Sequence, residues 1–253
     1  MMLFPTTTEK VNKKFPYATW ALIIINALVF WWQLQIPPEN LRSVYLDVLV
    51  VPANIMANPF SPETLLDIMR STFMHGSFGH IIGNMLFLLL FGANVERKIG
   101  VGLFLFLYLI SGFTAALLHV IFFPTEIIPA LGASGAISGL MGLYLVLFPR
   151  SKIRGLFPLG AILYPFFYPI LGDLAFVLFF ILWYMEWPAW IFLGIILFRD
   201  ASGAIESLNT INVGGTGHFA HLGGFLPGMI FGLMIHLARL SNPKKKWKQQ
   251  LLY

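Results

Sequence analysis

Gly132-Ala-Ser-Gly-Ala-Ile-Ser-Gly-Leu-Met-Gly142 shows most directly how this chain packs its helices. The stretch opens an apolar segment, yet it carries two serines and four glycines where a lipid-facing helix carries Leu, Ile and Phe. Small residues of this kind let helix backbones approach one another closely in a bilayer. Ser134, which precedes Gly135, is therefore either part of a packing seam or a nucleophile at the end of a buried helix.

The composition around this stretch is that of an integral membrane protein. The chain has 253 residues, of which 58% are hydrophobic and 11% are charged, whereas about 25% of the residues in a soluble domain are charged. There are no cysteines, so disulfides and thiolate metal sites are excluded. We expect no cofactor and no metal. The net charge of +5 does not indicate nucleic-acid binding, because the basic residues lie between apolar segments rather than in one patch.

Six apolar segments approach the length of about 20 residues that a membrane-spanning helix needs. The sequence therefore predicts an all-α polytopic membrane protein. The predicted spans cover residues 17–34, 79–95, 101–123, 134–148, 187–198 with a few more residues at either end, and 218–237.

The remaining segments divide the chain into a short N-terminal segment (1–16), a membrane domain (17–240) and a basic tail (241–253). Within the membrane domain, prolines and acidic residues interrupt the apolar stretch 156–186. This stretch forms either a re-entrant segment or a hairpin, so that the region around the fifth span crosses the membrane once or three times. The predicted connections are a long mixed-charge segment at 35–74 and a polar, glycine-rich loop from Asp200 to Gly217.

Lysines and arginines follow a clear topological bias. Of the 16 in the chain, all but Arg42, Arg70 and Arg199 fall in the two terminal segments and the alternate loops, thirteen against three. Because basic loops stay on the cytoplasmic side, we expect both termini to be cytoplasmic. We expect a prokaryotic plasma membrane, a site that opens to the outside, and no removable targeting peptide.

With this orientation, the second, fourth and sixth spans all begin on the same side of the membrane. Near these ends lie His80 and Asn84, then Ser134, then His218 and His221. Polar side chains are costly to hold in a bilayer and are functional candidates for that reason. The orientation was assigned only from the positions of lysines and arginines. The shared depth of these polar residues was therefore not built into the assignment.

Glycine pairs predict how the fourth and sixth spans meet. Gly135 lies four residues before Gly139, and Gly224 lies four residues before Gly228. His221 lies on the same helical face as Gly224 and Gly228. If these seams meet, Ser134 and His221 face each other, as a serine–histidine dyad requires.

Physical reasoning alone leaves several functions open. Ser134 by itself is more often a packing residue than a nucleophile, and a histidine at a helix end is more often an interfacial residue. The clustering of polar residues supports a catalytic site and a proton-coupled transporter about equally. His218 is the rival of His221 for the role of a base, although its spacing to the glycines is less favourable.

Three ordered motifs resemble those of the rhomboid intramembrane serine proteases. They are His75-Gly-Ser-Phe-Gly-His80-Ile-Ile-Gly-Asn84, Gly132-Ala-Ser134-Gly135 and His221-Leu-Gly-Gly224-Phe-Leu-Pro-Gly228. They match the family patterns HxxxxHxxxN, GxSG and HxxGxxxG, each on the expected span. Each motif is weak alone, but the ordered set across about residues 70–230 is specific.

The resemblance implies a bundle of six transmembrane helices that hydrolyses peptide bonds in or near the transmembrane segments of membrane proteins. It implies that Ser134 is the nucleophile and that His221 is the general base. The oxyanion hole would consist of the Ser134 backbone N–H and the side chains of His80 and Asn84, a set of donors that suits a developing negative charge. For His75 it implies an indirect role. The glycines of the second and third motifs would support the site.

Some positions depart from the family pattern. Ser138 stands where the family often has a tyrosine that packs on the catalytic histidine, and Met69-Arg70 replaces a frequent Trp-Arg pair. The sequence shows no acid that would complete a triad. These departures leave gating and substrate choice open. The alternative function is that of a non-catalytic relative that binds and escorts membrane helices.

Overall fold

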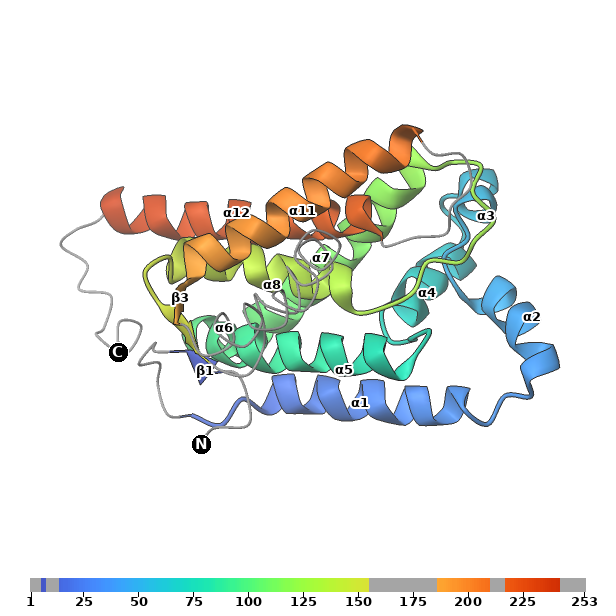
Figure 1. Ribbon diagram of the computed structural model, residues 1–253, viewed down its shortest axis with the longest axis horizontal. Helices are drawn as coiled ribbons and strands as arrows, with labels where there is room; N and C mark the ends of the chain where they lie inside the picture. Colours follow the sequence, from blue (N-terminus) through green and yellow to red (C-terminus); the bar gives the residue numbers. More distant parts are fainter. Residues whose placement is uncertain (1–5, 8–13, 155–185, 210–216, 242–253) are drawn as a thin grey trace, which may run out of the picture.

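The computed structural model describes residues 6–7, 14–154, 186–209 and 217–241. The predicted segment 156–186 and the basic tail lie almost entirely outside the described residues, as does most of the N-terminal segment. The described part of the chain is a bundle of helices (Figure 1).

All six predicted spans form helices, which confirms the predicted fold class. They are α1 (Tyr17–Gln33), α7 (Val101–Phe122), α8 (Ser134–Leu147), α11 (Ala189–Asn209), α12 (His218–Ser241) and, for the second span, a continuous run of α5 (Phe78–Phe87), η1 (Leu88–Gly92) and α6 (Ala93–Ile99). Within the described residues, three stretches are long and apolar enough to cross a membrane, namely Phe78–Ile99, Val101–Phe122 and His218–Ala238. Tyr17–Gln33 and Ser134–Leu147 are shorter apolar helices.

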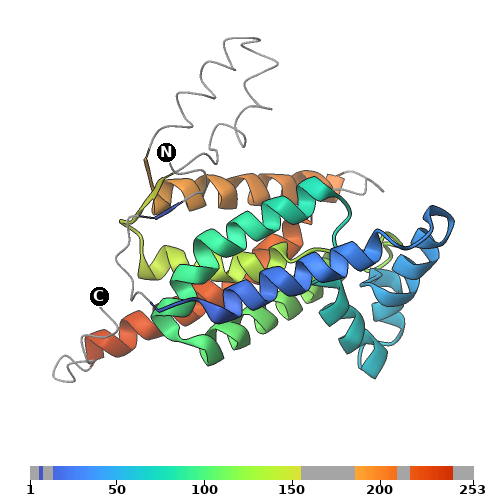
Figure 2. The same ribbon diagram turned by 90° about the horizontal axis from the view of Figure 1, so that it is seen from below.

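Helix α8 lies at the centre of the bundle. Every residue from Gly135 to Tyr144 is buried, and α8 contacts α5, α7, α11 and α12, as Figure 2 also shows. Because a central helix touches neighbours on all sides, its sequence has no polar face. The fully buried large side chains include Tyr144 of α8 itself, Phe91 and Tyr108.

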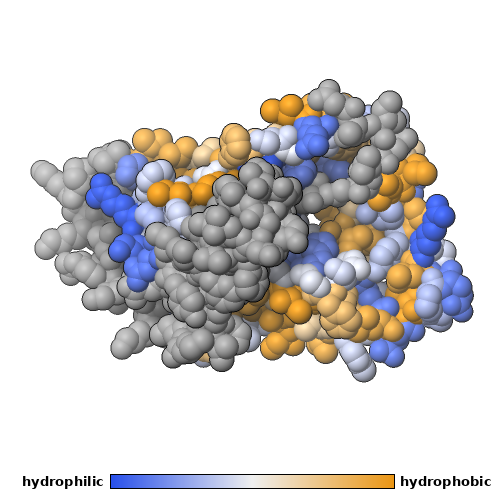
Figure 3. All heavy atoms as spheres, in the orientation of Figure 1, coloured by the Kyte–Doolittle hydropathy of each residue, from blue (hydrophilic) through white to orange (hydrophobic). Residues whose placement is uncertain are grey.

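The long connection 35–74 contains three short helices instead of an extended loop. They are α2 (Pro38–Val48), α3 (Pro52–Ala57) and α4 (Pro62–Ser71). Each begins with a proline, which suits the first turn because its φ is already helical and its missing N–H would have no partner there. These helices lie at the end of the bundle where α1 ends (Figure 1), and hydrophilic side chains gather over that end (Figure 3).

A small antiparallel sheet was not predicted. Its strands β1 (Thr6–Thr7), β2 (Lys152–Arg154) and β3 (Trp187–Pro188) are arranged in that order. Strands of two or three residues are too short to leave an alternating pattern in the sequence. Lys152 and Glu186 form an ion pair of 3.3 Å beside it. The sheet follows the C-terminal end of α8, so it lies away from Ser134.

Helix α11 corrects the predicted end of the fifth span. The expected loop began at Asp200, but α11 continues to Asn209. Arg199 and Asp200 indicated an exit from the membrane because charges are costly in lipid. In the structure Asp200 is only 3% exposed, since other side chains of the bundle pair with it. Asp200 can therefore lie in the middle of this helix instead of ending it.

Candidate functional site

One cavity of about 860 Å³ gathers most of the predicted site residues. Its walls come from α4, α5, α7, α8, α11, α12 and the segment that precedes α8. Of the residues predicted from the sequence, the lining includes His80, Asn84, Gly132, Ser134, Gly135 and His221. His75, Gly224 and Gly228 lie outside the lining and act on the site through packing.

Ser134 is the first residue of α8, and Gly132 sets the turn that leads into it. Gly132 has φ +121°, a conformation that residues with a Cβ rarely adopt. A Cβ at Gly132 would also lie 2.7 Å from Nε2 of His80. The Gly132 N–H donates to the Ser71 carbonyl at 2.8 Å. This glycine therefore brings the start of α8 directly against His80, and the first N–H groups of α8 have no intrahelical acceptor.

The glycine seams of α8 and α12 meet as predicted. A Cβ added to Gly224 would contact the carbonyl oxygen of Gly135, and one added to Gly228 would contact the carbonyl oxygen of Gly139. Both glycines of α12 thus face backbone, which cannot yield as a flexible side chain can. Because the two helix backbones touch, Ser134, just before Gly135, and His221, one turn before Gly224, reach the same cavity.

Helix α5 supplies two nitrogen-bearing side chains to the opposite wall. Ser77 caps this helix and accepts a hydrogen bond from the His80 N–H at 3.2 Å. Asn84 follows one turn later and is 7% exposed. Its Nδ2 is buried and has no hydrogen-bond partner among the described residues. A buried amide donor without a partner is costly, so this nitrogen would gain a hydrogen bond with an acceptor that reaches it.

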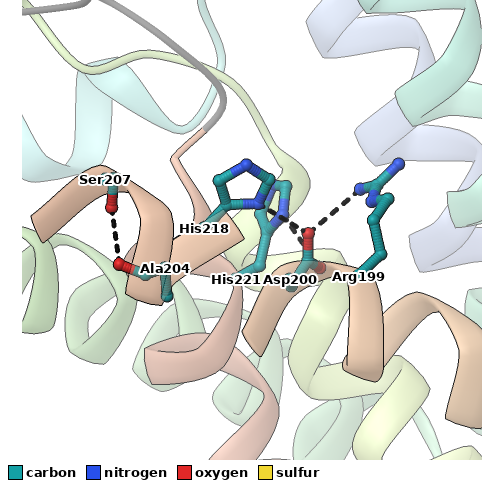
Figure 4. Close-up of polar contacts among 6 residues, drawn as sticks. All are labelled: Arg199, Asp200, Ala204, Ser207, His218 and His221. Atoms are coloured by element: carbon teal, nitrogen blue, oxygen red, sulfur yellow. Dashed lines mark hydrogen bonds and ion pairs between the residues drawn. The ribbon is translucent and has the colours of Figure 1, made fainter. Parts of the chain in front are cut away.

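His221 pairs with an acidic residue that the sequence analysis did not identify. Its Nδ1 lies 3.2 Å from Oδ2 of Asp200. His218 Nδ1 lies 3.0 Å from the other carboxylate oxygen, and Arg199 Nη2 lies 3.0 Å from that same oxygen. Figure 4 shows both imidazoles and the guanidinium directed at the one carboxylate.

Asp200 was missed because it was placed in a loop. The available signal was a single acid immediately after an apolar run, at a position where it could still be helical. In α11 its carboxylate faces α12 and contacts His221, so the structure supplies an acid that orients this imidazole. Ser138, which occupies the position of the family's aromatic residue, also lines the cavity.

Ser134 and His221 share the cavity without a direct bond. No hydrogen bond of the Ser134 hydroxyl is found among the described residues. Catalytic hydrogen bonds are often long in ligand-free enzymes and shorten when substrate binds. The two residues of the expected dyad therefore line the same cavity, but they are not hydrogen-bonded to each other.

His75 lies behind the site rather than in it. Its backbone N–H donates to Gln33 Oε1 at 3.0 Å, and Gln33 Nε2 donates to the His75 carbonyl at 3.1 Å. The imidazole is 1% exposed and its ring centre lies 5.0 Å from that of His80. Burial, together with the neighbouring His80, lowers the pKa of His75 to about 4. This neutral ring supports His80 from the side away from the cavity.

The fold and the site together define a polytopic helical membrane protein with a serine, histidines and a carboxamide around one internal cavity. The family model described as Rhomboid domain matches residues 62–238, more than half of the chain. The chain therefore belongs to the rhomboid family.

Three relatives illustrate this membership. Rhomboid protein 1, mitochondrial, of Saccharomyces cerevisiae is 28% identical over 92% of this chain and 57% of its own length. RHOMBOID-like protein 6, mitochondrial, of Arabidopsis thaliana is 26% identical over 72% of this chain and 46% of its own length. Rhomboid protease GluP of Bacillus subtilis is 40% identical over 31% of this chain and 15% of its own length. The chain thus spans about half the length or less of these relatives.

The relatives correct the predicted location. Those from Saccharomyces cerevisiae and Arabidopsis thaliana that cover most of the chain are named as mitochondrial, so the prediction of a prokaryotic plasma membrane is wrong. The predicted cytoplasmic termini and outward-facing site depended on that membrane. A bias of basic residues shows which loops share a side, but it does not identify the membrane that the helices cross.

Proposed function

We propose that this chain is an intramembrane serine protease that cleaves peptide bonds in or near transmembrane segments of membrane proteins. The observation that carries the proposal is the cavity, because one wall presents Ser134, another presents His221, and a third presents His80 and Asn84. Membership in a family that includes a protease among the relatives of this chain supports it. No metal or cofactor takes part in the proposed reaction.

In the first step Ser134 Oγ attacks the carbonyl carbon of the substrate, and His221 takes the hydroxyl proton. Because Nδ1 of His221 faces Asp200, Nε2 is the nitrogen that acts as the base. A carboxylate that accepts a hydrogen bond from Nδ1–H holds the imidazole in this tautomer and stabilises the imidazolium that forms. Asp200 is therefore a positioning residue, which takes the role that an aromatic residue at position 138 would have.

The attack places negative charge on the former carbonyl oxygen of the substrate. The backbone N–H of Ser134, the Nδ2 of Asn84 and the ring of His80 are the donors proposed for this oxyanion. The unpartnered Nδ2 of Asn84 supports this role, because a buried donor without a partner gains a hydrogen bond when an oxyanion reaches it. Donors that are held in place before the reaction stabilise the transition state at little further cost.

The intermediate then collapses. His221 gives its proton to the leaving amine, the peptide bond breaks, and the acyl group stays on Ser134. His221 then takes a proton from water, which attacks this ester. As the bond to Ser134 Oγ breaks, His221 returns the proton to that oxygen, and the second product leaves.

The proposed partners are transmembrane segments of substrate proteins and the surrounding lipid bilayer. We place the protein in a mitochondrial membrane, on the names of its relatives. We also propose that the membrane domain runs from about residue 17 to 240, because α1 packs on α5 and α7 although it precedes the matched family segment.

The experiment that tests the proposal is covalent labelling with a fluorophosphonate probe, followed by mapping of the modified residue. We expect Ser134 to be the labelled residue. Ser134→Ala and His221→Ala should each abolish labelling and the cleavage of a model transmembrane substrate. Ser138→Ala is the matched control, because Ser138 lies one turn further along the same helix and lines the same cavity.

The alternative is a non-catalytic relative that binds and escorts membrane helices. The missing bond between Ser134 and His221 among the described residues is the observation that favours it. This alternative predicts no fluorophosphonate labelling and unchanged helix binding in Ser134→Ala. A proton-coupled transporter is less well supported, because the described polar residues named above gather in one cavity and, among the described residues, form no relay across the bundle.

A further inference from the structure

The carboxylate of Asp200 and the imidazoles of His218 and His221 form a cluster at the edge of the cavity. Two elements supply it, α11 with the acid and the first turn of α12 with both histidines. The three residues offer one ligand atom each, and these atoms all lie within 4.8 Å of one another. The proposed reaction uses Asp200 and His221, but it gives His218 no task.

From this cluster we propose that the site binds a divalent transition-metal ion, with Zn²⁺ as the representative, and that binding inhibits the protein. The ion would be held by a carboxylate oxygen of Asp200 and by Nδ1 of His218 and His221. The ion is a regulator and not a cofactor. The binding itself is independent of the proposed protease activity, whereas its inhibitory effect rests on that proposed function.

The donor set fits Zn²⁺ chemically. Two imidazole nitrogens and one carboxylate oxygen are ligands that zinc sites use, with a fourth position left for water or another group. Imidazoles favour zinc, copper and nickel over magnesium and calcium. The sequence spacing also fits, because His218 and His221 stand three residues apart on one helix and therefore point to the same side.

The distances are close to what such a site needs. Bonds of about 2.0–2.2 Å in a tetrahedral arrangement separate neighbouring ligand atoms by roughly 3.3 Å. His218 Nδ1 lies 3.0 Å from Oδ1 of Asp200, and His221 Nδ1 lies 3.2 Å from the other oxygen, Oδ2. Because the two histidines contact different oxygens, the carboxylate must turn so that one oxygen faces the ion together with both nitrogens. The three ligand atoms already lie within 4.8 Å of one another.

One group opposes the ion. Arg199 Nη2 lies 3.0 Å from Oδ1 of Asp200, and its charge repels a cation. The Arg199 side chain is 36% exposed, whereas that of Asp200 is 5% exposed. The guanidinium can therefore turn away while the carboxylate stays in place. Arg199→Gln should strengthen metal binding for this reason.

Access to the cluster comes from the cavity. Asp200, His221 and Arg199 line it, and the His218 side chain is 20% exposed. An ion bound there would hold Nδ1 of His221 and remove its bond to Asp200. With Nδ1 bound to the ion, the proton of the neutral imidazole lies on Nε2. Nε2 could then no longer accept the proton of Ser134, so the ion would block the general base without touching the nucleophile.

The test measures metal binding first and activity second. The full chain is purified in detergent with a tag that lacks histidine, and Co²⁺ is added while its visible absorption is followed. We expect one tightly bound equivalent, which Zn²⁺ displaces. The same result is expected for Ser134→Ala, which cannot cleave, so a failure of the proposed protease function does not affect this measurement.

The decisive variant is His218→Asn. Its amide can replace the hydrogen bond of His218 to Asp200, but it is a poor zinc ligand, so the fold is retained while a ligand is lost. Zinc affinity should fall by at least the 10–100-fold that loss of an outer-shell partner typically costs. His236→Gln, on the exposed side of the same helix, and His119→Gln, in the same cavity, are the controls and should bind as the wild type does.

The second measurement is cleavage of a model substrate at increasing Zn²⁺. We expect inhibition that a chelator reverses, with the half-inhibitory concentration raised at least tenfold in His218→Asn relative to its own uninhibited rate. Zinc binding that persists unchanged in His218→Asn, or that disappears in His119→Gln instead, overturns the proposal. Absence of Co²⁺ and Zn²⁺ binding to the wild type overturns it as well.

Discussion

The contact between α8 and α12 differs in kind from the contact between α11 and α12. In the first, glycines face backbone, as Gly228 does at the Gly139 carbonyl oxygen. In the second, a buried carboxylate joins side chains, as Asp200 does with His221. The first contact determines how near the two helices lie, and the second determines which way one imidazole points. Position and orientation in this site thus depend on separate interactions.

This difference has an energetic reason. In a bilayer the lipid is as apolar as the helix surfaces, so close backbone contact supplies association that burial of apolar surface cannot. A buried ion pair is a poor source of stability because desolvation offsets the attraction between the charges. The Asp200 contact is therefore better understood as a device that sets geometry. Variants of the two contacts should separate activity from stability.

Among variants outside the proposed dyad, the largest effect is expected for Asp200→Asn. The carboxamide can donate to Nδ1 of His221 and so select the wrong tautomer, which should lower kcat by about 10²–10⁴. KM and the thermal unfolding temperature should change little, because the side chain keeps its volume. Steady-state kinetics with a transmembrane substrate, together with a melting curve, measure both. Unchanged kcat would show that Ser134 and His221 act without an acid.

Asn84→Ala tests the wall that belongs to neither contact. Removing one oxyanion donor should lower turnover by about 10²–10³, mostly in kcat. Asn94→Ala is a suitable control, because Asn94 lies further along the same continuous helix and its Nδ2 donates to the Leu90 carbonyl at 2.7 Å. Equal losses in the two variants would indicate a general structural effect and would remove Asn84 from the proposed oxyanion hole.

Gly228→Ala tests the contact between α8 and α12. Its Cβ would meet the backbone of Gly139, and overpacking of this kind costs about 1–3 kcal/mol in the free energy of unfolding. Gly194→Ala on α11 is the matched control, because nothing lies within 4 Å of its added Cβ. That variant should be neutral or stabilising, since alanine favours a helix by up to about 1 kcal/mol over glycine. If melting curves show Gly194→Ala to be less stable than Gly228→Ala, the close backbone contact between α8 and α12 is contradicted.

The smallest effect concerns pH and the histidine behind the site. Burial holds the pKa of His75 at about 4, below its ordinary value of 6.5. Between these values the unfolded chain binds more protons than the native one, so this histidine lowers stability as pH falls from 6.5 toward 4. His75→Gln, which does not titrate, should show a flatter loss of thermal stability over this interval. Parallel curves for the two proteins would mean that His75 does not contribute to this acid sensitivity.

The sequence predicted much of the fold because its signals are local. Apolar length placed the helices that became α1, α7 and α8, and the glycine spacing of α8 and α12 predicted their contact. The motif residues His80, Asn84, Ser134 and His221 were predicted to share a site, and the structure places them around one cavity. Their catalytic roles stay predictions. The prolines of residues 35–74 were recognised, but the three helices that they begin were not.

What the sequence by itself determined, then, is the position of six apolar helices and the glycines through which two of them touch. These features depend on residue type and on spacing within one helix, and both can be read along the chain. The tertiary structure alone decided the partner of His221. A charge such as Asp200 indicates the end of a span when it is considered alone, because lipid would exclude it. Inside the bundle it is shielded from lipid and paired with residues of α12, which no local pattern records. The orientation of the proposed base is therefore a property of how α11 packs against α12.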